Sequence, residues 1–151
     1  MKGFILILLF SNINCIEQIK ESNERDSIKL TETAIWKVYR TKDSIPKIFY
    51  HAYFESRGKE FLIANPSEEW QKTDVILRDS IPTRQLKFIA NKGNDWRISY
   101  EEGGFGRSKI LAEFQIFGDT LKNYRGTYTN LNIDNNDSVE SHLKHRRLVL
   151  P

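Results

Sequence analysis

Short runs in which apolar and polar residues alternate dominate the chain from Ile28 onward, and this alternation limits the possible folds more than any other feature. A period of two places successive side chains on opposite faces of a β-strand, whereas a helix needs a period of 3.6. The runs with this pattern lie at 28–30, 36–38, 48–54, 75–77, 86–90, 96–100 and 110–116. The chain is therefore predicted to be mainly β.

Glycine-containing segments between these runs predict antiparallel connections. The segment 91–95 has the length of a hairpin loop, and Gly93 can adopt the positive φ that a tight turn requires. Gly118 and Asp119 can close the next hairpin, while 101–106 forms a longer loop. We therefore expect an antiparallel meander that forms a small barrel or a sandwich.

Two segments carry the signature of a helix start. Asn65 and Glu68, with a proline between them, form a capping pair that predicts one or two helical turns. Asp137 and Glu140 form a similar pair ahead of a basic stretch. A final strand at 148–150 is equally compatible with the end of the chain. The predicted fold thus contains one or two short helices beside the sheet.

The composition excludes several classes of protein. The 23 Lys and Arg residues nearly balance the 20 Asp and Glu residues, which leaves a formal net charge of +3. A mixed surface of this kind lacks the basic stripe of a nucleic-acid-binding protein, so we expect no nucleic-acid partner. The single cysteine, Cys15, excludes an internal disulfide and a zinc site made of cysteines alone.

The first fifteen residues have the order of an export signal. Met1 and Lys2 precede an apolar run at 4–10, and polar residues then lead to Cys15. Seven apolar residues are too few for a membrane-spanning helix, which needs about 20. The segment from 16 to 27 is charged and lacks aromatic residues, which is typical of a tether.

The residues Asn12, Ile13, Asn14 and Cys15 resemble a lipobox, the site at which a bacterial lipoprotein is lipidated on cysteine and loses the preceding peptide. Asn12 and Asn14 stand where the usual pattern has an aliphatic and a small residue. The resemblance implies attachment to a membrane of the bacterial cell envelope through the lipid on Cys15. The implied organisation is a signal peptide at 1–14, the lipidated cysteine and tether at 15–27, and a β-rich domain at 28–151. The alternative is a buried amino-terminal strand in which Cys15 packs as a small hydrophobe.

The glycine-rich loop at 101–106 supplies the candidate ligand-binding residues. Gly103 and Gly104 can expose backbone amides, Phe105 offers an aromatic ring, and Arg107 offers a guanidinium. These groups together suit an anionic or ring-shaped ligand. The loop lacks the strand–loop–helix context of a dinucleotide site and the Gly-Lys-Ser ending of a phosphate loop. A flexible hairpin without a ligand is the alternative.

Residues that could carry acid, base or metal chemistry are few. His142 and His145 are three apart on a predicted helix, but no third metal ligand accompanies them and the neighbouring residues are basic. Glu101 and Glu102 are adjacent in a strand and therefore point to opposite faces, unlike the carboxylate pair of a glycosidase. His51 fits a half-buried strand position. We therefore expect no metal, no cofactor and no enzymatic activity.

These observations predict a lipid-anchored envelope lipoprotein whose β domain binds a small ligand or another protein without catalysis. The alternative is an inhibitor or immunity-type protein that neutralises an envelope enzyme or toxin, which a stable stoichiometric complex would reveal. A small hydrolase that uses Glu101 or His51 is the third interpretation. It would lose its activity when either residue is changed to alanine.

Overall fold

The computed structural model describes residues 35–74, 80–145 and 147–148. The described elements are β1 (Lys37–Tyr39), the 3₁₀ helix η2 (Lys42–Ser44), α2 (Lys47–Arg57), β2 (Arg84–Lys92), β3 (Asp95–Glu102), β4 (Ser108–Phe117), β5 (Thr120–Thr129) and α3 (Asn136–Lys144). The predicted signal peptide, lipidation site and tether, and the runs at 28–30 and 75–77, lie outside the described residues.

The five described strands form one antiparallel sheet in the order β1-β2-β3-β4-β5, which confirms the predicted mainly β meander. Gly93 at φ 60° and Gly118 at φ 57° close the β2–β3 and β4–β5 hairpins, as the sequence predicts. The loop at 103–107 joins β3 to β4. Among the described strands the sheet is open, with β1 and β5 at its edges.

The segment 48–54, predicted to be a strand, is instead part of helix α2. The alternation of Ile48, Tyr50, Ala52 and Phe54 was misleading, because the side chains that pack on the sheet recur at every fourth residue. These are Ile45, Phe49 and Tyr53, and Tyr50, three residues before Tyr53, packs beside them as a helical period of 3.6 allows. Pro46 precedes the first helical residue without disturbing the helix, and Gly58 ends it in the left-handed conformation at φ 65°.

A β-bulge in β2 corrects the prediction that Leu86, Phe88 and Ala90 share one face. The pairing with β3 shifts between Leu86 and Phe88, so that Lys87 is an extra residue. Leu86 consequently packs in one core, while Phe88 and Ala90 pack in the core on the opposite face of the sheet. The bulge lets β2 contribute large apolar side chains to both faces.

The two predicted helix starts have different outcomes. Asn65 and Glu68 bond to each other as predicted, but the segment forms a single turn and no helix. Helix α3 is present, although its N-cap is Asn135, whose side chain accepts a hydrogen bond from the Ser138 backbone amide at 2.8 Å. The predicted cap, Asp137, lies in the first turn of α3.

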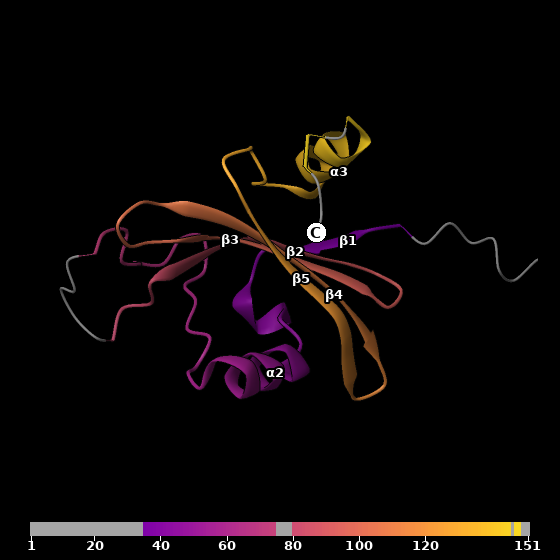
Figure 1. The fold of residues 1–151 in the computed structure, drawn as a ribbon, viewed down its shortest axis with the longest axis horizontal. Helices are drawn as coiled ribbons and strands as arrows, with labels where there is room; N and C mark the ends of the chain where they lie inside the picture. Colours follow the sequence, from indigo (N-terminus) through magenta and orange to yellow (C-terminus); the bar gives the residue numbers. More distant parts are fainter. Residues whose placement is uncertain (1–34, 75–79, 146, 149–151) are drawn as a thin grey trace, which may run out of the picture. The chain divides into compact units, whose positions relative to one another are not determined.

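Helices cover the two faces of the sheet, with α2 on one side and α3 on the other (Figure 1). The α2 face carries the larger core, in which aromatic rings from the helix pack on the strands together with Phe61 and Ile63. On the α3 face a smaller core is formed by Phe88, Ala90, Leu111, Ile133, Val139 and Leu148. Beside this smaller core the sheet carries charged side chains, and these lead to the candidate site.

None of the helices in the described part of the chain has the length and apolar character needed to cross a membrane.

Candidate functional site

A buried arginine organises the α3 face of the sheet. Arg97 projects from β3, and its Nε donates a hydrogen bond to Glu113 Oε1 at 2.6 Å. One terminal nitrogen donates to Asn136 Oδ1 at 3.2 Å and also pairs with the Glu140 carboxylate, both on α3. The guanidinium carbon lies 4.2 Å from the centroid of the Trp36 ring. Charge-assisted hydrogen bonds and ring stacking thus hold this cation in one position.

The strand register explains why these groups meet. Arg97 on β3 lies directly opposite Glu113 on β4, and Glu113 lies opposite Arg125 on β5. Directly paired residues project from the same face of a sheet, with their Cβ atoms about 4.5–5.5 Å apart. Three charged residues therefore form a row across β3, β4 and β5. The row alternates in sign, from Arg97 through Glu113 to Arg125.

An open cleft of about 690 Å³ lies over this row. Its charged lining residues are Lys92, Asp95, Arg97, Glu113, Arg125 and Glu140, three cationic and three anionic. Trp36, Gln115 and Asn123 add an aromatic ring and two amides to the same lining. A cleft of this volume is within the range of roughly 300–1,000 Å³ that small-ligand sites occupy.

One atom in the cleft lining lacks a partner. The Glu113 side chain is 10% exposed, and Arg97 occupies its Oε1. Within the described residues, nothing donates a hydrogen bond to Glu113 Oε2, although this oxygen is closed to solvent. A buried carboxylate oxygen without a donor costs free energy, on the order of 1–3 kcal/mol or more. Glu113 Oε2 is therefore a buried acceptor without a donor among the described residues.

The predicted ligand-binding loop lies elsewhere, because none of its residues lines this cleft. Gly103 has a packing role: a Cβ there would stand 2.2 Å from the Gln71 carbonyl oxygen. Gly104 adopts φ 139°, and the Phe105 side chain is fully exposed. Arg107 is also exposed. The predicted loop residues therefore do not line the cleft beside Arg97.

The residues considered for catalysis have separate partners. Glu101 pairs with Lys87 at 3.3 Å, whereas Glu102 pairs with Arg84. His51, predicted to be a half-buried strand residue, lies exposed on helix α2.

The two histidines near α3 also bond to different groups. His142 Nε2 lies 2.9 Å from the Asn132 carbonyl oxygen, and His145 Nδ1 lies 2.7 Å from the Ser141 carbonyl oxygen. Within 35–74, 80–145 and 147–148, no group of three or more His, Cys, Asp or Glu residues could hold a metal ion.

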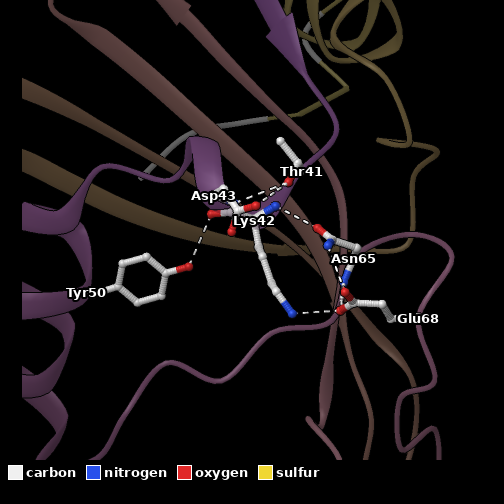
Figure 2. Close-up of polar contacts among 6 residues, drawn as sticks. All are labelled: Thr41, Lys42, Asp43, Tyr50, Asn65 and Glu68. Carbon is white, nitrogen blue, oxygen red and sulfur yellow. Dashed lines mark hydrogen bonds and ion pairs between the residues drawn. The ribbon is translucent and has the colours of Figure 1, made fainter.

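A second polar cluster joins η2 to the turn at 65–68 (Figure 2). The Lys42 backbone amide donates to Asn65 Oδ1 at 2.7 Å, and Lys42 Nζ contacts Glu68 Oε2 at 2.8 Å. The Asn65 side chain and backbone amide donate to the two Glu68 oxygens. The bond from Lys42 and those from Asn65 lower the pKa of Glu68 to about 2. Both carboxylate oxygens of Glu68 accept hydrogen bonds within the cluster, so the cluster has a structural role: it joins η2 to the turn at 65–68, and we call it the clamp.

The comparisons with known proteins add no relative, since no protein-family model, no curated protein and no solved structure matches the chain.

The sequence contains one signal for the Arg97 cluster that no motif captures. Arg97 occupies a polar position in the alternating run 96–100, but Glu113 stands between Ala112 and Phe114 and interrupts the apolar stretch 110–114 of a central strand. A charge at such a position is rarely buried without a partner. Pairing the two strands across the 103–107 loop would have placed the two charges together. Glu140 and Trp36 come from outside this hairpin and had no comparable signal.

Proposed function

We propose that this protein is a lipid-anchored lipoprotein of the bacterial cell envelope whose β domain binds a small ligand without catalysis. The anchor follows from the lipobox-like residues ending at Cys15 and from the charged tether that follows them. The tether holds the β domain away from the membrane surface, where its cleft meets ligands in the surrounding compartment.

The single observation that carries the binding role is the unpartnered Glu113 Oε2 in the lining of a cleft of about 690 Å³. Stability alone would favour an apolar pair at these buried positions, since a buried ion pair contributes little over well-packed hydrophobic residues. The Arg97–Glu113 pair is held in place by α3 and by the Trp36 ring, yet Glu113 Oε2 has no donor among the described residues. Fixed polar groups in a concave surface are typical of ligand-binding sites.

Intact mass and membrane fractionation of the protein expressed in a bacterium test the anchor, with Cys15→Ser as the matched variant. We expect the wild type to start at Cys15, to carry the mass of added acyl chains and to partition with membranes. The variant should gain no acyl mass. If both proteins retain Met1 and remain soluble, the lipoprotein proposal is wrong.

A second candidate function, an inhibitor or immunity-type protein, is favoured by the tip of the 103–107 loop. Phe105 is fully exposed there, while Gly103 is held by its backbone amide, which donates to the Thr83 carbonyl oxygen at 2.9 Å. An exposed aromatic ring on an anchored loop suits insertion into the active site of an enzyme. The test is a stoichiometric complex with a purified envelope enzyme or toxin on size-exclusion chromatography, which Phe105→Ala should abolish.

A further inference from the structure

We propose that the cleft binds a neutral, polyhydroxylated ligand, namely a saccharide; this inference rests on the binding function proposed above and names its ligand class. It is carried by three features of the lining: its charge balance, the arrangement of its donors and acceptors, and the immobility of the central cation.

The charge balance disfavours a ligand with a net charge. Three cationic and three anionic side chains line the cleft, so their formal charges cancel. An anionic group brought to Glu113 Oε2 would be repelled by the carboxylate. The Arg97 guanidinium already balances the Glu113 charge, so an ammonium group there would leave an excess positive charge. A neutral hydroxyl group can donate to this oxygen without repulsion and without adding a charge.

The pattern of donors and acceptors matches hydroxyl groups. Glu113 Oε2 requires a donor, while the adjacent Arg125 is exposed and has N–H groups to donate. A hydroxyl group donates and accepts at once, and a sugar presents several at neighbouring positions. Alternating acceptors and donors across paired strands can therefore bond successive hydroxyl groups of one ring.

The rim of the cleft adds planar polar groups that are already held in place. Asn123 Nδ2 donates to Gln115 Oε1 at 2.6 Å, and Gln115 Nε2 donates to Asp95 Oδ1 at 2.8 Å. This chain uses one donor from each amide and leaves Asn123 Oδ1 and Asp95 Oδ2 as further acceptors. Side chains fixed by their neighbours lose little entropy when they bond to a ligand.

Because Glu113 Oε2 is closed to solvent, a ligand can bond to it only after a neighbouring side chain moves, and Arg125 is the exposed neighbour on the paired strand. It projects beside Glu113 from the paired position on β5. We infer that Arg125 moves aside when the ligand enters and then donates to a second hydroxyl group. Arg97 cannot move in this way, because Glu113, Glu140, Asn136 and Trp36 all hold it.

The test uses the full-length protein, purified in detergent, on a glycan array that contains neutral, acidic and amino saccharides. Binding of the best neutral saccharide is then measured by titration calorimetry for the wild type and for Arg125→Ala, Glu113→Gln and Arg57→Ala. Arg57 is an exposed arginine at the end of α2, on the opposite face of the sheet, and serves as the matched control. Thermal unfolding of each variant verifies that it is folded.

The expected result is binding of neutral saccharides in preference to acidic and amino saccharides. Arg125→Ala and Glu113→Gln should each weaken this binding by at least about tenfold, the effect of losing a hydrogen bond to a charged group. Arg57→Ala should leave it unchanged. Arg125→Ala keeps the test decisive if Glu113→Gln fails to fold, because Arg125 is exposed.

Two results would overturn the saccharide inference. One is preferential binding of charged saccharides, and the other is no binding to any glycan on the array. A panel of nucleotides, amino acids and dipeptides, tested by thermal shift, then separates the two proposals. If a member of this panel stabilises the wild type but not Arg125→Ala, the cleft binds a ligand of another class. If no member does so, the binding function itself is wrong.

Discussion

The two faces of the sheet are built on different principles. On the α2 face, Phe49 is the centre of a cluster of rings, with Phe61 at 5.0 Å and Phe114 at 5.1 Å between centroids. On the α3 face, the corresponding central position holds the buried Arg97–Glu113 pair beside a smaller apolar core. The first face maximises apolar burial, which is the main source of folding free energy. The second gives up part of that burial and keeps fixed polar groups next to a cleft, which is the arrangement on which the proposed binding role rests.

The largest expected effect tests the contribution of the α2 face. Phe49 is 1% exposed, so Phe49→Ala removes a ring from the middle of the core. We expect the free energy of unfolding to fall by about 3–5 kcal/mol, from lost burial and the cavity left behind. Urea denaturation followed by circular dichroism measures it, with the fully exposed Phe105→Ala as control. A loss below about 1 kcal/mol would contradict the assignment of the main core to this face.

The second prediction asks whether the ion pair on the α3 face stabilises the fold. Arg97→Met leaves Glu113 buried without its cation, and the free energy of unfolding should fall by about 3 kcal/mol. In the double variant Arg97→Met, Glu113→Leu, two apolar side chains replace the pair, and stability should return to within about 1 kcal/mol of the wild type. Denaturant titration of both variants checks this. A double variant as unstable as the single one would show that the pair serves stability rather than recognition.

The third prediction compares two residues at the start of α3. Asn135→Ala removes the side-chain acceptor for the Ser138 amide and should cost about 1 kcal/mol. Asp137→Ala, an exposed change within the first turn, should cost less, because only its charge near the helix dipole is lost. The two unfolding midpoints decide between these caps. Equal losses would mean that the observed cap contributes no more than the one predicted from sequence.

The smallest expected effect concerns the clamp that joins η2 to the turn at 65–68. The bonds from Lys42 and Asn65 hold the pKa of Glu68 near 2, against an ordinary value of 4.5. A lowered pKa in the folded state means that this carboxylate stabilises the fold above pH 4.5, and that the contribution is lost as the pH falls toward 2. Thermal unfolding between pH 2 and pH 6 should therefore be less pH-dependent in Glu68→Gln. The exposed Glu55→Gln on α2 is the control, and an identical slope in Glu68→Gln would contradict the clamp.

Local patterns were sufficient for strands β3 and β4 and for the turns that contain Gly93 and Gly118. Trp96, Ile98 and Tyr100 alternate on one face, as do Ile110, Ala112 and Phe114, and both sets pack in the α2-face core. Gly93 and Gly118 take the positive φ that their turns require. These features depend on side-chain periodicity and backbone sterics, which act between near neighbours in the chain.

Local patterns failed where two periods coexisted. The segment 48–54 alternates like a strand, yet Ile45, Phe49 and Tyr53 recur at helical spacing, and packing against the sheet selected the helix. In β2, the extra residue Lys87 reverses the facing of everything that follows it. A bulge leaves no mark on the polar pattern, because one inserted residue is compatible with either face until the partner strand is known.

The sequence by itself determined the antiparallel meander, its hairpins and the helix at the carboxyl-terminal end, because each depends on residues close together in the chain. Only the tertiary structure decided which groups form the candidate site. Arg97 and Glu113 are 16 residues apart, and Arg97 and Glu140 are 43 apart. Their meeting depends on the strand register and on the docking of α3, and both are set by burial across the whole sheet. Charge and polarity can be read from the chain, but the oxygen left without a donor is a property of the packed molecule.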